Sequence, residues 1–280
     1  MGSGSAPYPE RVSAERTQHN ARLFGQVAPT YDRLGFLTLA ARHLAARTPI
    51  RAGDHVLDVA CGTGTVALAL AERVGPQGTV TGTDLAPEMV EVARRKGVGA
   101  VNLRFEVADG AALPFPDATF DVVTCAAGLF FLPDMTAALR EWRRVLRPGG
   151  RVVFSTFGRG LLGDLPGLWR ERLAGDGVKP GAPPLGRVPT PAAALDLLRG
   201  AGFTQAEAEL TRLEYVLPDA GARWADIQAG LEGAPLATFP EARRAELRAA
   251  HLAELSPLFA GGPVTVPIPV IVSRGIRAAG

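Results

Sequence analysis

The chain has 280 residues, of which 47% are hydrophobic and 21% charged, and its formal net charge is +2. This length suits one α/β domain with a modest elaboration and is ample for a buried core, while its 33 glycines and 23 prolines fall short of the share typical of low-complexity chains. Composition and charge therefore exclude a disordered, collagen-like or coiled-coil chain, and they give no strong field to attract nucleic acid.

Two helical patterns occupy the first part of the chain, and short β-rich runs then alternate with helical patterns. The first two helices fall within residues 15–48. Strands are expected at residues 55–60, 78–83, 101–108, 120–126 and 151–156, with helices between them at 65–74, 87–96 and 134–146. Strands separated by helices of this length form right-handed βαβ units, so the sequence predicts a parallel, doubly wound sheet.

The last part of the chain is more irregular. Residues 158–190 are rich in Gly and Pro, with one short helical stretch near Trp169, and a helix at 192–199 precedes a strand at 206–217. Residues 219–256 are expected to be helical, and a last strand is expected at 265–274. Because that strand contains Pro267 and Pro269, we expect it at a sheet edge or at a bulge.

Cysteine usage and apolar runs favour a soluble, cytoplasmic protein. Cys61 and Cys125 each lie in an apolar segment, and two thiols form neither a disulfide scaffold nor a metal cluster. The first residues lack the basic and apolar regions of a signal peptide and are expected to be a flexible leader. The longest apolar run, residues 122–132, is about half the length that a membrane span needs.

A glycine-rich turn after the first strand of the alternating region carries most of the functional information. It reads VLDVACGTG at residues 56–64 and opens a helix, so Gly62 and Gly64 let the backbone approach a ligand near unpaired helix N–H groups. With Ala67 the spacing is G-x-G-x-x-A, which also suits a dinucleotide. Asp84 ends the next strand. There its carboxylate would accept hydrogen bonds from the ribose hydroxyls of either of two ligands, a dinucleotide or S-adenosylmethionine.

Asp58 distinguishes between these two ligands. It lies at the carboxyl end of the first strand, beside the glycine turn, where ligands bind in such sheets. A carboxylate there repels a pyrophosphate by roughly 4 kcal/mol at a separation near 4 Å. S-adenosylmethionine (SAM) has no phosphate and carries an ammonium and a sulfonium, both of which a carboxylate attracts. The electrostatics favour SAM.

Four segments then match one family in order: VLDVACGTG at 56–64, TGTDLAPEM at 81–89, VADGAALPFPDATFDVV at 107–123 and RVLRPGG at 144–150. With these motifs the sequence resembles a class I SAM-dependent methyltransferase of the type 11 group, which includes the C-methyltransferases of ubiquinone and menaquinone synthesis. The segment at 27–32 is similar to the one that precedes the core in quinone methyltransferases. The resemblance implies a Rossmann-like, seven-stranded, mainly parallel sheet with an antiparallel last strand.

The same resemblance implies a division of the chain and a set of cofactor residues. We expect a leader at 1–14, an N-terminal helical cap at 15–48, a SAM-binding core at 49–157, and the remaining core strands with substrate-covering insertions at 158–280. The positions implied in SAM binding are Tyr31, Asp58, Ala60, Gly62, Gly64, Asp84, Leu85, Met89, Asp109, Gly110, Cys125 and Ala126. No metal is implied.

Among these positions, Asp58 would hold the methionine part of SAM, Asp84 the ribose hydroxyls and Asp109 the adenine edge, while Tyr31 would close over the bound molecule. Each position also has a structural alternative. Asp84 and Asp109 could act as caps or turn residues. Tyr31 could anchor the N-terminal helices, and Leu85 and Met89 could be ordinary core.

The sequence shows no convincing catalytic base. The weak candidate is His19, because it lies on the N-terminal segment that covers the pocket in relatives. The variable segments carry the aromatic side chains expected to form the acceptor pocket, namely Phe24, Phe130, Phe131, Trp169 and Trp224. Such walls suit an apolar or aromatic small molecule.

We therefore expect a SAM-dependent methyltransferase that moves a methyl group to an O, C or N atom of a small metabolite. The alternatives are an NAD(P)-dependent oxidoreductase, a non-catalytic SAM-binding protein and an RNA methyltransferase. The last should show a basic rim, but Arg140, Arg143 and Arg144 fall at helical spacing on the helix at 134–146, which indicates a solvated face. The sequence leaves the choice between a monomer and a homodimer open.

Overall fold

The computed structural model describes residues 8–178 and 184–279, with side chains from residue 15 onward. The helices are α1 (Tyr8–Val27), α2 (Gly35–Arg47), α3 (Thr65–Val74), α4 (Pro87–Lys96), α5 (Met135–Val145), α6 (Leu165–Gly175), α7 (Pro191–Gly200), α8 (Ala220–Ala229) and α9 (Glu241–Leu255). The strands are β1 (His55–Val59), β2 (Thr79–Asp84), β3 (Leu103–Val107), β4 (Phe120–Ala126), β5 (Leu146–Phe157), β6 (Thr204–Leu217) and β7 (Val264–Ile276). Short 3-10 helices are η1 (Tyr31–Arg33), η2 (Leu129–Phe131), η3 (Pro184–Arg187), η4 (Leu231–Thr238) and η5 (Ser256–Phe259).

The seven strands form one sheet in the order β3-β2-β1-β4-β5-β7-β6. Strands β1 to β5 are parallel, and β7 is antiparallel to both of its neighbours. This topology confirms the doubly wound, mainly parallel sheet with an antiparallel last strand. The reversal of strand order between β1 and β4 leaves a crevice at their carboxyl ends, which is where ligands bind in open α/β sheets.

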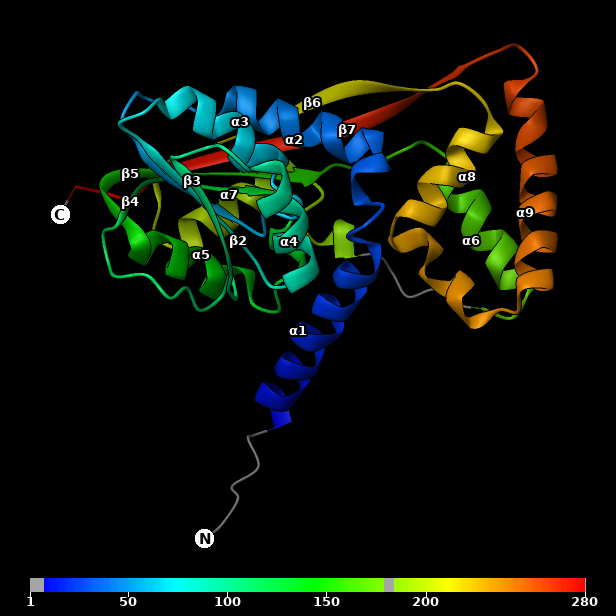
Figure 1. The fold of residues 1–280 in the computed structure, drawn as a ribbon, viewed down its shortest axis with the longest axis horizontal. Coiled ribbons are helices and arrows are strands. Elements are labelled where there is room, and N and C mark those ends of the chain that lie inside the picture. The colour runs from blue at the N-terminus through cyan, green and yellow to red at the C-terminus, as the bar shows by residue number, and fades with distance from the viewer. Residues whose placement is uncertain (1–7, 179–183, 280) are drawn as a thin grey trace, which may run out of the picture.

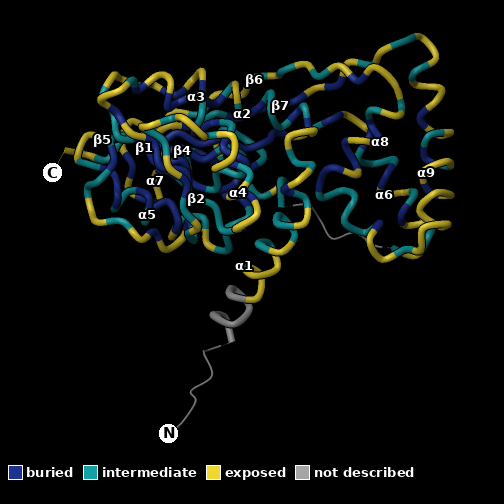
Figure 2. The backbone as a smooth tube through the Cα atoms, viewed as in Figure 1, coloured by how far each residue is buried: buried dark blue, intermediate teal, exposed yellow. Residues whose placement is uncertain are grey.

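Helices cover both faces of this sheet, and each face has its own apolar core. On one face, Leu44 of α2, Leu70 of α3 and Val90 of α4 pack in one buried cluster. On the other face, Trp142 of α5 and Leu198 of α7 belong to a second cluster. Figure 2 shows the buried residues concentrated along the strands between these layers. The carboxyl ends of the strands are thus held rigidly from both sides.

A separate group of helices stands away from the sheet, beyond the end of the long β6–β7 hairpin (Figure 1). It consists of α6, α8 and α9, whose apolar faces meet in a cluster that includes Trp169, Trp224 and Leu247. We call these three helices the helical cap; the name does not include the N-terminal helical segment at residues 15–48. None of the helices in the described part of the chain is long and apolar enough to cross a membrane.

Local sequence signals explain where most helices begin. The Asp134 carboxylate accepts from the Ala137 N–H at 2.9 Å at the start of α5, and the Asp219 carboxylate caps α8 in the same way at 2.8 Å. Helix α1 begins at Tyr8, within the stretch 1–14 expected as a leader, while residues 1–7 lie outside the described chain.

The two prolines of β7 have a different setting from the one expected. β7 lies inside the sheet, yet its pairing with β5 ends at Val270, so Pro267 and Pro269 pair with β6 alone. On the opposite side, the Pro269 carbonyl accepts from the Gly158 N–H at 2.8 Å. Because a strand residue directs its N–H and C=O to the same side, the missing N–H groups face this loop and not the β6 ladder.

Candidate active site

Two adjoining cavities lie at the carboxyl ends of β1, β2 and β4, with volumes of ≈ 760 and ≈ 550 Å³. Together they bring to one place nearly all of the residues expected to bind the cofactor. Those that line at least one cavity are Tyr31, Asp58, Ala60, Gly62, Asp84, Leu85, Met89, Asp109, Gly110 and Ala126. Gly64 and Cys125 do not line either cavity. The thiol of Cys125 is fully buried in the core beneath α5, and burial raises its pKa.

The glycine turn folds as its sequence requires. Gly62 and Gly64 have φ of 54° and 86°, in the left-handed region that glycine adopts without strain. A Cβ on Gly64 would lie 2.9 Å from the Phe105 ring, so this glycine also permits close packing at the start of α3. Gly62 lines both cavities, whereas Gly64 lines neither of them and packs against Phe105.

Two alanines at the ends of strands have the same left-handed backbone, which is strained for a residue with a side chain. Ala60 follows β1 and Ala127 follows β4, and both have φ of 52°. Both also line the two cofactor-side cavities. Backbone strain of this kind costs of order 1–3 kcal/mol and is found at ligand sites, where the surrounding structure holds it in place.

Asp58 is a buried carboxylate with one free oxygen. It is 1% exposed, and its Oδ1 accepts a hydrogen bond from the Thr124 hydroxyl at 2.7 Å. Its Oδ2 has no hydrogen-bond partner among the described residues. Burial raises the pKa of Asp58 from 3.8 to about 7, against the opposing effects of the Thr124 hydroxyl and of the Ala67 backbone at the start of α3. A cationic donor entering the ≈ 550 Å³ cavity would satisfy this oxygen, so the site fits the ammonium of SAM.

Asp84 and Asp109 both accept hydrogen bonds from nearby backbone N–H groups, as the alternative role of cap or turn residue requires. Both also line the ≈ 760 Å³ cavity. The Asp84 carboxylate accepts from the Gly62 N–H at 2.8 Å and from the Ala86 N–H at 3.0 Å, and burial raises its pKa. The Asp109 carboxylate accepts from the Ala111 N–H at 2.9 Å. These contacts fix the orientation of each carboxylate and leave lone pairs free for a ligand.

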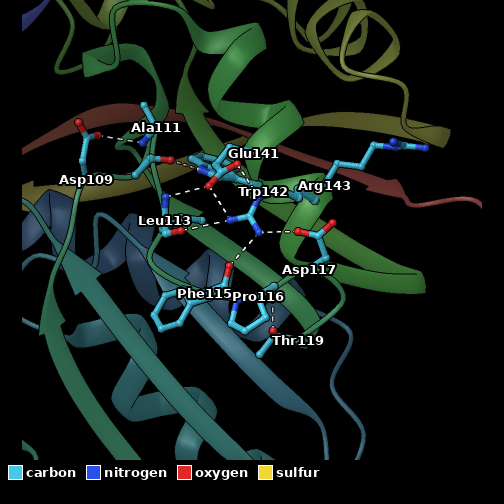
Figure 3. A network of polar contacts seen from close by, with 12 residues as sticks. Asp109, Ala111, Leu113, Phe115, Pro116, Asp117, Thr119, Glu141, Trp142 and Arg143 are labelled. Carbon is cyan, nitrogen blue, oxygen red and sulfur yellow. Dashed lines mark hydrogen bonds and ion pairs between the residues drawn. The ribbon is translucent and has the colours of Figure 1, made fainter.

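The loop that carries Asp109 is tied to α5 by a network of polar contacts (Figure 3). The Trp142 indole donates to the Gly110 carbonyl at 2.8 Å. Arg144 donates to the carbonyls of Leu113 and Phe115 at 3.1 and 2.8 Å, and it forms ion pairs of 2.7 Å with Asp117 and Glu141. Arg144, expected on a solvated face of this helix, is 32% exposed and also braces the loop.

A third and larger cavity, of ≈ 1450 Å³, adjoins the first two. Tyr31 and Ala127 line all three cavities, so they stand at the junction. The walls of the third cavity are mainly apolar and include Phe24, Leu34, Phe36, Phe130, Phe131, Phe157, Leu162 and Leu185. Burial raises the pKa of Tyr31, so its phenol stays protonated at the junction. This is the space available for a second small molecule beside the cofactor.

Three expected site residues lie elsewhere. Trp169 and Trp224, which were expected in the acceptor pocket, line none of the three cavities and are buried in the core of the helical cap. There, with ring centroids 5.6 Å apart, they pack edge to face. His19 is exposed on α1 and lines none of the three cavities. No group of three or more His, Cys, Asp or Glu side chains within the described ranges could hold a metal ion.

The comparisons with known proteins agree with this geometry. Residues 56–150 match the model of the methyltransferase domain family. A curated relative, nocamycin O-methyltransferase of Saccharothrix syringae, is 35% identical, and the match covers 92% of this chain and 99% of that protein. The chain belongs to the class I SAM-dependent methyltransferases.

Two further comparisons extend this assignment. Demethylmenaquinone methyltransferase of Deinococcus radiodurans is 42% identical to this methyltransferase, but the match covers 51% of this chain and 62% of that protein. The solved structure of the YcgJ protein of Bacillus subtilis matches with a TM-score of 0.57 and 23% identity, over 86% of this chain and 99% of that one. That likeness shows a shared fold.

The family membership confirms the enzyme class predicted from the motifs. The methyltransferase uses SAM as its methyl donor and a small metabolite as its acceptor, and the comparisons do not favour the oxidoreductase, non-catalytic and RNA-modifying alternatives. Sequence reasoning missed Asp226, a buried carboxyl group of α8 that lines the third cavity. No motif marks it, because α8 lies far along the chain from the cofactor motifs at residues 56–150.

Proposed function

We propose that this methyltransferase transfers the methyl group of SAM to a hydroxyl oxygen of a small, mainly apolar metabolite. The observation that carries the proposal is the ≈ 1450 Å³ apolar cavity that joins the cofactor-side cavities at Tyr31 and Ala127. Its mainly apolar walls, with a few polar side chains, suit a small organic molecule. The name of the relative that matches over 92% of the chain, an O-methyltransferase, favours oxygen as the methylated atom.

The cofactor-side cavities fit SAM part by part. The free Oδ2 of Asp58 would pair with its ammonium, and the fixed carboxylate of Asp84 would accept from its ribose hydroxyls. Asp109 would accept from the adenine amine. Met89, which is 1% exposed in the wall of the ≈ 760 Å³ cavity, would pack on the adenine. Tyr31 would cover the molecule at the junction.

The protein's own contribution to the reaction is placement and the exclusion of water. SAM supplies an activated methyl group whose transfer neutralises charge, so no nucleophilic side chain is required. Holding two reactants in line can contribute roughly 7–11 kcal/mol through effective molarity. Helix α1 and η1 cover one side of the cavities, with the Asn20 amide donating to the Phe131 carbonyl at 3.1 Å. The helical cap and η4 cover the other side, through Asp226 of α8 and Glu232 of η4.

Carbon methylation is the second candidate, because the demethylmenaquinone relatives match at higher identity. That match covers 51% of this chain, whereas the O-methyltransferase match spans 92% of it. Most of the third cavity is built by segments that flank residues 56–150, including α1, α6 and α8, so the broader match is the more informative one about the acceptor.

Methyl-labelled SAM and three probes of similar shape test this proposal. The protein is incubated with 2-naphthol, 2-naphthylamine or 2-naphthoic acid, and mass spectrometry locates the label in the product. We expect transfer to the oxygen of 2-naphthol. Transfer to nitrogen or to a ring carbon, or no transfer to any probe, would contradict the proposal.

A further inference from the structure

The third cavity contains a carboxyl group that has no structural task. Asp226 lies on α8, is 4% exposed, and lines the cavity. Its Oδ1 is 3.5 Å from the Tyr215 hydroxyl, a long contact. Within the described part of the chain, its Oδ2 accepts from no donor. A buried carboxylate oxygen without a hydrogen-bond partner is unfavourable, so its presence beside a mainly apolar cavity calls for a ligand.

The charged groups around Asp226 neutralise it only in part. Arg223, one turn earlier on α8, forms an ion pair with Glu232 at 2.8 Å, and its Nη2 donates to that carboxylate, while its Nε and Nη1 have no hydrogen-bond partner among the described residues. Tyr215 faces Asp226 from β6 and keeps its own proton, because burial raises its pKa to about 12. Burial raises the pKa of Asp226 to about 6, with Arg223 opposing the shift and Glu232 adding to it.

We propose that Asp226 binds the hydroxyl group of the methyl acceptor and takes its proton during transfer. This inference rests on the proposed function, and it names the group that the cavity recognises. The acceptor class is then an apolar molecule with a phenolic or enolic hydroxyl, aligned by one carboxylate. Arg159 and Arg170 are exposed cations at the cavity wall and cannot serve as the base.

The proposed step balances without a further reactant. The O–H bond of the acceptor breaks and its proton goes to the carboxylate of Asp226. The acceptor oxygen forms a bond to the methyl carbon with its electron pair, and the S–CH₃ bond breaks with its pair left on sulfur. The products are the methyl ether, S-adenosylhomocysteine and a protonated Asp226, which returns its proton to water.

The first test compares 2-naphthol with 2-methoxynaphthalene, which lacks the hydroxyl hydrogen. Both are titrated by calorimetry into protein saturated with S-adenosylhomocysteine. Wild type should bind 2-naphthol at least about tenfold more tightly than the ether, the size of one charge-assisted hydrogen bond. Asp226→Leu, of similar volume, should lose this preference. The matched control Asp219→Asn, an exposed cap on the same helix, should keep it.

The second test follows the proton. Asp226→Asn keeps the shape of the side chain but cannot take a proton, so it should lower kcat for 2-naphthol by about 10²–10⁴-fold. It should also remove the rise of wild-type kcat with pH that accompanies ionisation of Asp226. A purely structural role would lower stability and leave the pH profile unchanged.

The outcomes separate this inference from the function beneath it. If the wild type and the Asp226 variants bind SAM equally well, and only the Asp226 variants lose the 2-naphthol preference and the pH dependence, the proposal stands. If SAM binds but wild type shows no preference for 2-naphthol, or Asp226→Asn keeps the wild-type pH profile, the role of Asp226 is wrong and the methyltransferase assignment is untouched. If wild type does not bind SAM, both fail.

Discussion

Asp58→Asn should make the ligand-free protein more stable and the cofactor complex weaker. The wild-type carboxylate is 1% exposed, and burial raises its pKa from 3.8 to about 7. Between these values the folded state holds a proton that the unfolded state has released, so the free energy of unfolding falls as pH rises through this window. A shift of three units corresponds to about 4 kcal/mol, an upper bound on what the charge costs above pH 7.

The neutral amide escapes this cost and still accepts the hydrogen bond from Thr124. We therefore expect Asp58→Asn to raise the free energy of unfolding by about 1–4 kcal/mol at pH 8, and by much less at pH 5. The same change removes the charge that would pair with the ammonium of SAM. A charge-assisted hydrogen bond contributes about 1.5–3 kcal/mol, so SAM affinity should fall by roughly ten- to a hundredfold.

Denaturant unfolding without ligand at pH 5 and pH 8, together with calorimetric titration of SAM, measures both effects. Asp134→Asn is the control, because it keeps the exposed cap of α5 and should behave alike at both pH values. If the stability advantage of Asp58→Asn over wild type is no larger at pH 8 than at pH 5, the burial argument fails. If SAM affinity is unchanged, the ammonium is bound elsewhere.

Three further changes test the scaffold of the site. Arg144→Met removes the contacts that brace the loop carrying the proposed adenine contacts, so it should cost about 1–3 kcal/mol in denaturant unfolding and weaken SAM binding; an unchanged SAM affinity would separate this loop from the cofactor. Gly64→Ala places a Cβ 2.9 Å from Phe105 at φ of 86° and should cost about 1–3 kcal/mol, whereas equal thermal stability would refute the strain at this turn. Lys96→Met breaks the contacts of 3.0 and 3.2 Å to Asp32, beside Tyr31, and should speed SAM dissociation a few-fold in stopped-flow measurements; an unchanged rate would show that η1 does not retain the cofactor.

The sequence predicts the core well where function and local structure coincide. The turn at Gly62 and Gly64 requires left-handed backbone, which glycine favours, and Asp134 caps its helix through its own side chain. These features depend on neighbours within a few residues, so a local pattern is sufficient to find them. The carboxyl ends of parallel strands meet at one edge of the sheet, so the places of Asp58 and Asp84 at their strand ends put both carboxylates at that edge.

The acceptor side depends on contacts that no local pattern encodes. Trp169 and Trp224 carry the same aromatic signal as Phe130, yet they pack on each other because α6 and α8 bury their apolar faces together. Arg144 is typical of an exposed helix face by its spacing alone. Only the fold of the loop at 109–119 around it turns that arginine into a brace.

The two cavities beside the glycine turn are proposed to hold SAM. Calorimetric titration of the purified protein with SAM, S-adenosylhomocysteine and NADH, in parallel, measures this binding without any other assumption. We predict that SAM and S-adenosylhomocysteine bind, that NADH does not, and that Asp58→Asn weakens SAM. Binding of NADH without SAM would contradict the interpretation of Asp58 and the account of the site built on it.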